Sequence, residues 1–135
     1  MINVQDETIE LENNIIIIRK HNFTDKYNER VNRDNLEGSD VSHIKYIMIH
    51  YTVICECQTL STFKNSEASA HYVINKEGVI LNIVPDKFRA WHAGVGDLVY
   101  PSLLNNHYEN IKNDMNSYSI GIEIVNSGFE EYTIQ

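Results

Sequence analysis

The sequence predicts an α/β fold in which a mixed central β-sheet is flanked by helices. Three observations predict it. Residues 46–52 form an apolar run of strand length, residues 72–75 and 79–84 form two strand-like segments around a short turn, and residues 119–125 form a strong β-branched strand. Residues 61–69 are compatible with a short helix and a loop, so helix and strand signals are mixed along the chain.

The amino-acid composition excludes several classes of function for this chain. A length of 135 residues fits a single domain with a real core. Eleven basic and nineteen acidic side chains give a net charge of −8, which disfavours binding to nucleic acid. No apolar stretch approaches the roughly 20 residues of a transmembrane helix, and the acidic start of the chain does not resemble a signal peptide. The sequence by itself therefore predicts a cytoplasmic protein with no transmembrane segment.

The first 43 residues are expected to be a lead before the main domain, which would occupy residues 44–135. The lead alternates polar clusters with one isoleucine run, residues 15–18. Four isoleucines could form a helical turn, but β-branching favours a short strand. We therefore expect one strand in the lead.

Residues 46–52 form a largely apolar run bounded by Lys45, which is typical of a central strand buried on both faces. The segment 72–84 predicts a β-hairpin, because Gly78 can adopt the positive φ of a tight turn. Pro85 should end its second strand. Cys55 and Cys57 are too close in sequence for an unstrained disulfide and too few for a structural zinc site.

Residues 94–116 are polar and irregular and contain Pro101, so we expect a long surface loop with at most a short helix near 108–112. Residues 119–125 should be the last strand. Residues 132–135 look like the opening of a helix with Thr133 as its N-cap.

Two polar residues in the expected strands are candidates for chemistry. His50 ends the apolar run 46–52, where a rigid strand could hold a zinc ligand; a satisfied core histidine is the alternative. Glu123 alternates with isoleucines, which should place Gly121, Glu123 and Val125 on one face. A carboxylate among apolar neighbours is costly unless it is paired or functional, although an exposed edge-strand position would also tolerate it.

Four motifs occur in order along the chain. They are IMIHYT (residues 47–52), SAHY (69–72), RAWHAG (89–94) and SIGIEIVN (119–126). Together they resemble the zinc-dependent N-acetylmuramoyl-L-alanine amidases, the peptidoglycan-cleaving family that includes phage-type amidase lysozymes and peptidoglycan recognition proteins. The resemblance covers about residues 27–135, and it implies the α/β amidase fold.

The resemblance also implies residue roles. His50 would be the first zinc ligand, and Glu123 would activate a zinc-bound water as general base. His71, Trp91, His92 and Gly94 would line the groove for sugar and stem peptide, although Trp91 could equally be a core anchor. Some phage-type relatives have a catalytic tyrosine where this chain has Ala70, so catalysis here would depend on Glu123.

In this family a later histidine and an aspartate or cysteine complete the zinc site, and a C-terminal helix covers the sheet. No G-H-x-D-like segment occurs before Gln135, and none of the remaining histidines matches the missing positions: His21, His43, His71, His92 and His107. The expectation is therefore a C-terminally truncated amidase domain that binds zinc poorly and hydrolyses little. A noncatalytic muropeptide-binding module, or half of a split protein completed by a second chain, is the alternative. A peptidoglycan substrate would place the protein in the envelope or periplasm.

Overall fold

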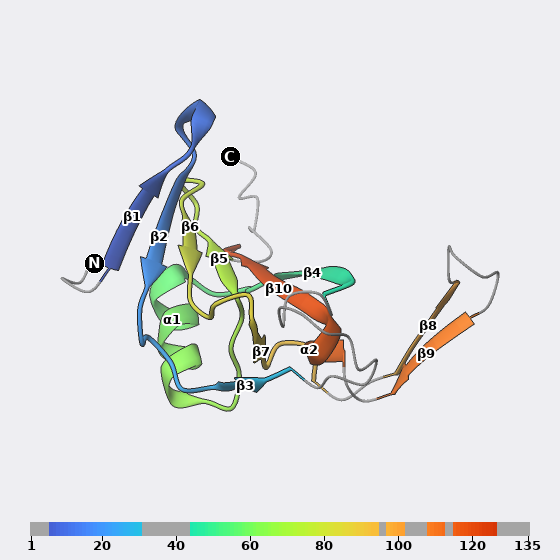
Figure 1. The fold of residues 1–135 in the computed structure, drawn as a ribbon. Coiled ribbons are helices and arrows are strands. Elements are labelled where there is room, and N and C mark those ends of the chain that lie inside the picture. Colours follow the sequence, from blue (N-terminus) through green and yellow to red (C-terminus); the bar gives the residue numbers. More distant parts are fainter. Residues whose placement is uncertain (1–5, 31–43, 95–96, 102–107, 113–114, 127–135) are drawn as a thin grey trace, which may run out of the picture.

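The computed structural model describes residues 6–30, 44–94, 97–101, 108–112 and 115–126. Its centre is a six-stranded sheet with the strand order β1-β2-β6-β5-β10-β4 (Figure 1). The β1–β2 and β5–β6 pairs are antiparallel, whereas β2–β6, β10–β5 and β10–β4 are parallel. The sheet is therefore mixed, as the sequence predicts. Its strands are β1 (Asp6–Glu10), β2 (Ile16–Lys20), β4 (Tyr46–Tyr51), β5 (Tyr72–Ile74), β6 (Ile80–Asn82) and β10 (Ser119–Ile124).

The remaining elements are not part of this sheet. They are the 3-10 helix η1 (Glu12–Asn14), the helices α1 (Glu56–Asn65) and α2 (Met115–Tyr118), and the strand pairs β3 (Tyr27–Glu29) with β7 (Phe88–Ala90) and β8 (Asp97–Pro101) with β9 (Tyr108–Lys112). Within the described residues, no helix is long and apolar enough to cross a membrane.

Several sequence predictions are confirmed. The isoleucine run of the lead becomes β2, the predicted hairpin becomes β5 and β6 with Gly78 at φ +79°, and the last predicted strand becomes β10. The helix α1 begins earlier than predicted, at Glu56, and ends at Asn65. The expected helix at 132–135 lies outside the described residues.

The prediction of a loop with a short helix at 108–112 is wrong. Residues Asp97–Pro101 and Tyr108–Lys112 pair as antiparallel strands, with Val99 opposite Asn110. Neither segment has a clear apolar alternation, so each one alone carries a weak strand signal. The hydrogen bonds that stabilise them come from their mutual pairing, which a local pattern does not reveal.

The prediction that residues 46–52 form a central strand is also wrong. Among the described strands β4 pairs only with β10, at the end of the sheet. Ile47, Ile49 and Tyr51 are 65%, 67% and 69% exposed. The alternate residues Tyr46 and Met48 pack instead against α2. The run is apolar on both faces, but only one of those faces is covered.

The N-terminal segment is part of the folded sheet. Strand β2 pairs with β6, and β1 extends the sheet beyond it. At the end of β3, the buried Arg30 guanidinium donates hydrogen bonds to the backbone carbonyl oxygens of Asp86, Asn116, Ser117 and Ser119. These bonds tie the lead to the segment that enters β10.

The main core lies between α1 and one face of the sheet. Phe63 of α1 belongs to the same buried cluster as Val73 and Leu81, and Ile18 packs against that cluster. Register places Ile18, Leu81 and Val73 side by side on β2, β6 and β5. Because lateral neighbours point to the same face, α1 covers this face, and the next positions in the same row belong to β10 and β4.

Candidate functional site

Glu123 and His50 are lateral neighbours at the end of that row. Glu123 of β10 lies opposite Val73 of β5 on one side and opposite His50 of β4 on the other. Lateral neighbours in a sheet project from the same face. The structure therefore places the two candidate residues on neighbouring strands and on one face, beside the core that α1 covers.

Burial raises the pKa of the Glu123 carboxyl above its usual range, and the nearby His50 partly opposes that shift. The cause is desolvation, because removing water from a carboxylate disfavours its charged form. A carboxyl with a raised pKa holds a proton more readily near neutral pH, which suits a group that accepts and returns one.

His92 lies against this pair. It follows β7, and its Nδ1 atom is 3.2 Å from Nε2 of His50. Its ring lies directly over Gly121, where any Cβ atom would overlap it. On its other side, its Nε2 is 3.1 Å from Oγ of Ser119. The sequence placed His92 in a substrate groove, whereas the structure places it against the proposed metal ligand.

The backbone of His92 is also fixed. Oδ1 of Asn116 accepts hydrogen bonds from the backbone N–H groups of His92, at 3.1 Å, and of Ala93, at 2.9 Å. Burial, followed by the neighbouring His71 and His50, lowers the pKa of His92 to about 3. The imidazole is therefore neutral around pH 7.

His71 is fully buried, so it offers no surface to a substrate in this structure. Its Nδ1 accepts a hydrogen bond from the Gly121 N–H at 3.0 Å, and its Nε2 lies 2.8 Å from the Phe88 carbonyl oxygen, to which it donates. Burial lowers the pKa of His71 to about 4. The expected substrate contact is replaced by a structural role, since both ring nitrogens already bind the backbone.

Trp91 and Gly94 flank His92 and the following Ala93 in the chain. The Trp91 indole Nε1 donates to Oδ1 of Asn28 at 2.8 Å, and its backbone N–H donates to Oγ of Ser69 at 3.0 Å. Gly94 is exposed and adopts φ +63°, a conformation that side chains disfavour. Their contact with substrate remains a prediction.

Sequence reasoning missed three residues of the site. Ser119 and Gly121 have the same strand parity as Glu123, so alternation along β10 already placed them on its face. The sequence could not show that the His92 ring would lie against that face of β10. Asn116 carried no such signal, because its role is to hold the backbone of a segment 24 residues earlier.

Zinc is the metal that the resemblance implies, and His50 suits it as an imidazole ligand. His92 adds a second imidazole close by, and Glu123 adds a carboxylate on the same face. Within the described ranges, however, no group of three or more His, Cys, Asp or Glu side chains converges on one point. A zinc site with three protein ligands would therefore draw further donors from outside the residues that the structure describes.

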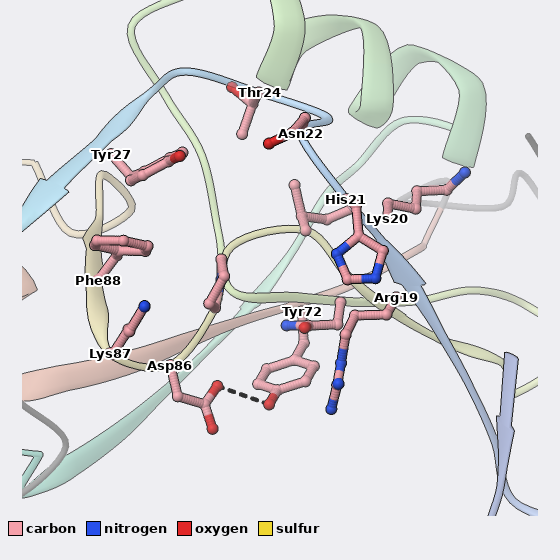
Figure 2. Close-up of a pocket in the computed structure, with 13 residues that line it drawn as sticks. Arg19, Lys20, His21, Asn22, Thr24, Tyr27, Tyr72, Asp86, Lys87 and Phe88 are labelled. Atoms are coloured by element: carbon pink, nitrogen blue, oxygen red, sulfur yellow. Dashed lines mark hydrogen bonds between the residues drawn. The ribbon is translucent and has the colours of Figure 1, made fainter. Parts of the chain in front are cut away.

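A cavity of about 520 Å³ lies elsewhere, between the end of β2, β3 and the segment before β7 (Figure 2). Tyr72 donates a 2.7 Å hydrogen bond to Asp86 on its wall. Several of its basic side chains have acidic neighbours: Arg19 and His21 lie near Glu7, and Lys20 contacts Asp6. Register puts Tyr72 in the row opposite to that of Val73, so this cavity is separate from the Glu123 site.

The fold and this site define an α/β domain with a histidine and a carboxylate side by side on the covered face of a mixed sheet. Residues 40–135 match the family described as N-acetylmuramoyl-L-alanine amidase, and the chain belongs to that family. The family resemblance that the four motifs predicted is confirmed.

Individual relatives agree with this assignment. The chain is 30% identical over 95 residues to the N-acetylmuramoyl-L-alanine amidase AmiD of Escherichia coli (strain K12), covering 65% of this chain and 30% of AmiD. The crystal structure of AmpDh3 from Pseudomonas aeruginosa aligns with a TM-score of 0.52 at 24% identity, over 75% of this chain and 41% of AmpDh3. AmpDh3 in complex with anhydromuramic pentapeptide aligns with a TM-score of 0.50 at 25% identity over the same shares. The chain thus spans less than half the length of these relatives.

Proposed function

We propose that this chain carries the His50 and Glu123 part of a zinc-dependent N-acetylmuramoyl-L-alanine amidase site. The reaction would be hydrolysis of the amide between N-acetylmuramic acid and L-alanine, in peptidoglycan or in muropeptides released from it. The observation that supports this most directly is the register of β10 with β4, which pairs Glu123 with His50 on one face.

Each residue would have a distinct part in the reaction. His50 would be a zinc ligand, and bound zinc would polarise the amide carbonyl and acidify a water molecule. Glu123 would take the proton of the attacking water and return it to the departing amine, which its raised pKa favours. Trp91 and Gly94 would contact the sugar and the peptide.

The relatives support the substrate class. One of them, AmpDh3, has been crystallised with anhydromuramic pentapeptide, and the match to it covers 75% of this chain and 41% of AmpDh3. The net charge of −8 disfavours binding to nucleic acid, and it is compatible with a cell-wall substrate.

The test is hydrolysis of a muramyl peptide by the chain with added zinc, compared with the Glu123→Gln variant. We expect the variant to lose about 100-fold to 10,000-fold in rate, the usual contribution of a general base. Glu77→Gln, in an exposed hairpin turn, is the matched control and should keep the full rate. Equal rates in all three proteins would contradict the assignment of Glu123.

Calorimetry with the same muramyl peptide in the presence of a chelator distinguishes the amidase from the alternative, a noncatalytic binding module. Binding that persists without metal, together with no hydrolysis when zinc is present, would indicate a noncatalytic muropeptide-binding module. Hydrolysis that chelation abolishes would support the amidase.

A further inference from the structure

We propose that His92 is a positioning residue that fixes the tautomer of His50, so that His50 presents Nδ1, and not Nε2, as the bare nitrogen for a metal ion. The inference rests on the proposed function only in naming the metal. The hydrogen bonds that support it run from α2 through β10 to β4, and they join groups of the protein without involving a metal ion.

The chain begins at Ser119. Its hydroxyl donates a hydrogen bond to the backbone carbonyl oxygen of Met115 at 2.7 Å. A serine hydroxyl has a single hydrogen and can otherwise only accept. Its Oγ also lies 3.1 Å from Nε2 of His92, so in that contact the serine accepts and the histidine donates. Nε2 of His92 therefore carries the proton.

The second step follows from the chemistry of imidazole. A neutral ring that is protonated on one nitrogen has a lone pair on the other. With its proton on Nε2, His92 has a bare Nδ1, and this atom lies 3.2 Å from Nε2 of His50. His50 must therefore be the donor in this contact, with its own proton on Nε2.

The third step identifies the free nitrogen. In the neutral form of His50, which is the form that can bind a metal ion, a proton on Nε2 leaves the lone pair on Nδ1. No described residue makes a hydrogen bond to that atom, and Glu123 is its lateral neighbour on the same face. Metal-ligating histidines commonly donate their second ring N–H to a fixed acceptor, which sets the tautomer and raises ligand basicity.

The acceptor is held rigidly, which distinguishes this contact from a chance approach of two rings. Asn116 fixes the backbone of His92 through two hydrogen bonds, and the ring fits only because residue 121 is glycine. A ligand whose orientation is set before the metal arrives loses little conformational freedom on binding. Ser119, Gly121 and Asn116 thus act on His50 through His92.

The tautomers can be read directly in the metal-free protein by long-range ¹H–¹⁵N correlation of ¹⁵N-labelled histidines at pH 7.5. We expect both His92 and His50 to be protonated at Nε2 and bare at Nδ1. A proton on Nδ1 of His50 would overturn the inference. In Ser119→Ala, which removes the acceptor, His92 should no longer show a single tautomer.

Zinc affinity measured by calorimetry supplies a second readout that does not depend on hydrolysis. His92→Ala should weaken binding about 10-fold to 100-fold, the usual loss for a group that orients a metal ligand. His92→Asn should recover most of that loss, because its amide oxygen can occupy the acceptor position of Nδ1. His21→Asn, an exposed histidine beside Glu7, is the control and should bind as the unchanged chain does.

The outcomes separate this inference from the proposed function. If His92→Asn binds zinc as weakly as His92→Ala, then Nδ1 of His92 is itself a ligand and the inference fails. If zinc affinity follows the expected order but no muramyl peptide is hydrolysed, the inference stands and the amidase proposal fails. Expected tautomers with no measurable zinc binding in the unchanged chain would overturn the metal role given to His50.

Discussion

The two faces of the central sheet are built from the same strands but have different surroundings. On one face, the row Ile18, Leu81 and Val73 lies under α1 and continues into Glu123 and His50. On the other, an apolar row crosses the same five strands, half-buried at β2, β6 and β5 and exposed at β10 and β4. Its members are Ile17, Ile80, Ile74, Ile124 and Tyr51.

This difference shows how the site is made. On the covered face, the apolar row ends where polar residues replace it, so Glu123 and His50 are half-buried beside a packed core. On the opposite face the apolar side chains continue to the last strand, and contiguous exposed apolar surface of this kind usually marks a contact surface. Covering a face therefore raises the pKa of Glu123 by burial, which apolar composition alone does not do.

We expect the largest effect on stability from a substitution that removes the contact of α1 with the covered face. Phe63 is 5% exposed in the main core, so Phe63→Ala should reduce the free energy of unfolding by about 3 to 5 kcal/mol through lost burial and a residual cavity. Guanidinium unfolding measures it. A loss below about 1 kcal/mol would mean that α1 does not anchor this face.

Gly121→Ala should disturb the site itself. The added methyl group would overlap the His92 ring, so the variant should lose about 1 to 3 kcal/mol of stability, the usual cost of overpacking. It should also weaken zinc binding. In the double variant Gly121→Ala with His92→Ala, the clash is gone, so the two stability losses should be less than additive. Full additivity would show that the ring does not lie over residue 121.

Stability should fall in mild acid because His71 is buried in its neutral form. Its pKa is about 4 in the folded protein and near 6.5 when unfolded, so its contribution is complete above pH 6.5 and is lost as the pH falls toward 4. Between pH 7 and pH 5 we expect a loss of about 2 kcal/mol from this group.

Urea unfolding across that range provides the measurement. The variant His71→Asn keeps an acceptor for the Gly121 N–H but does not titrate, so its stability should depend less on pH. A pH dependence that survives intact in His71→Asn would assign it to other groups.

The smallest effect concerns the exposed face. Ile49 is 67% exposed, so Ile49→Thr, which keeps β-branching, should change the free energy of unfolding by less than about 0.5 kcal/mol. If the exposed apolar face promotes self-association, the same substitution should reduce it at high protein concentration, as measured by light scattering. A destabilisation comparable to that of Phe63→Ala would show that this face is covered in solution.

The sequence by itself determined the class of fold and the candidate pair. Apolar runs, a turn glycine and β-branched segments are local signals, so β2, the β5–β6 hairpin and β10 could be predicted from them. The four motifs identified the family, and the alternation around Glu123 indicated which side of β10 it shares with Gly121.

Only the tertiary structure decided which strand lies at the edge, which face is covered and what surrounds His50. The position of β4 at the end of the sheet, among the strands that the structure describes, and the pairing of β8 with β9 depend on partners distant in sequence. His92 reaches His50 because Gly121 leaves room for its ring and Asn116 holds its backbone. These are contacts between segments that no local pattern connects, and for that reason burial and pKa at the site follow from the fold.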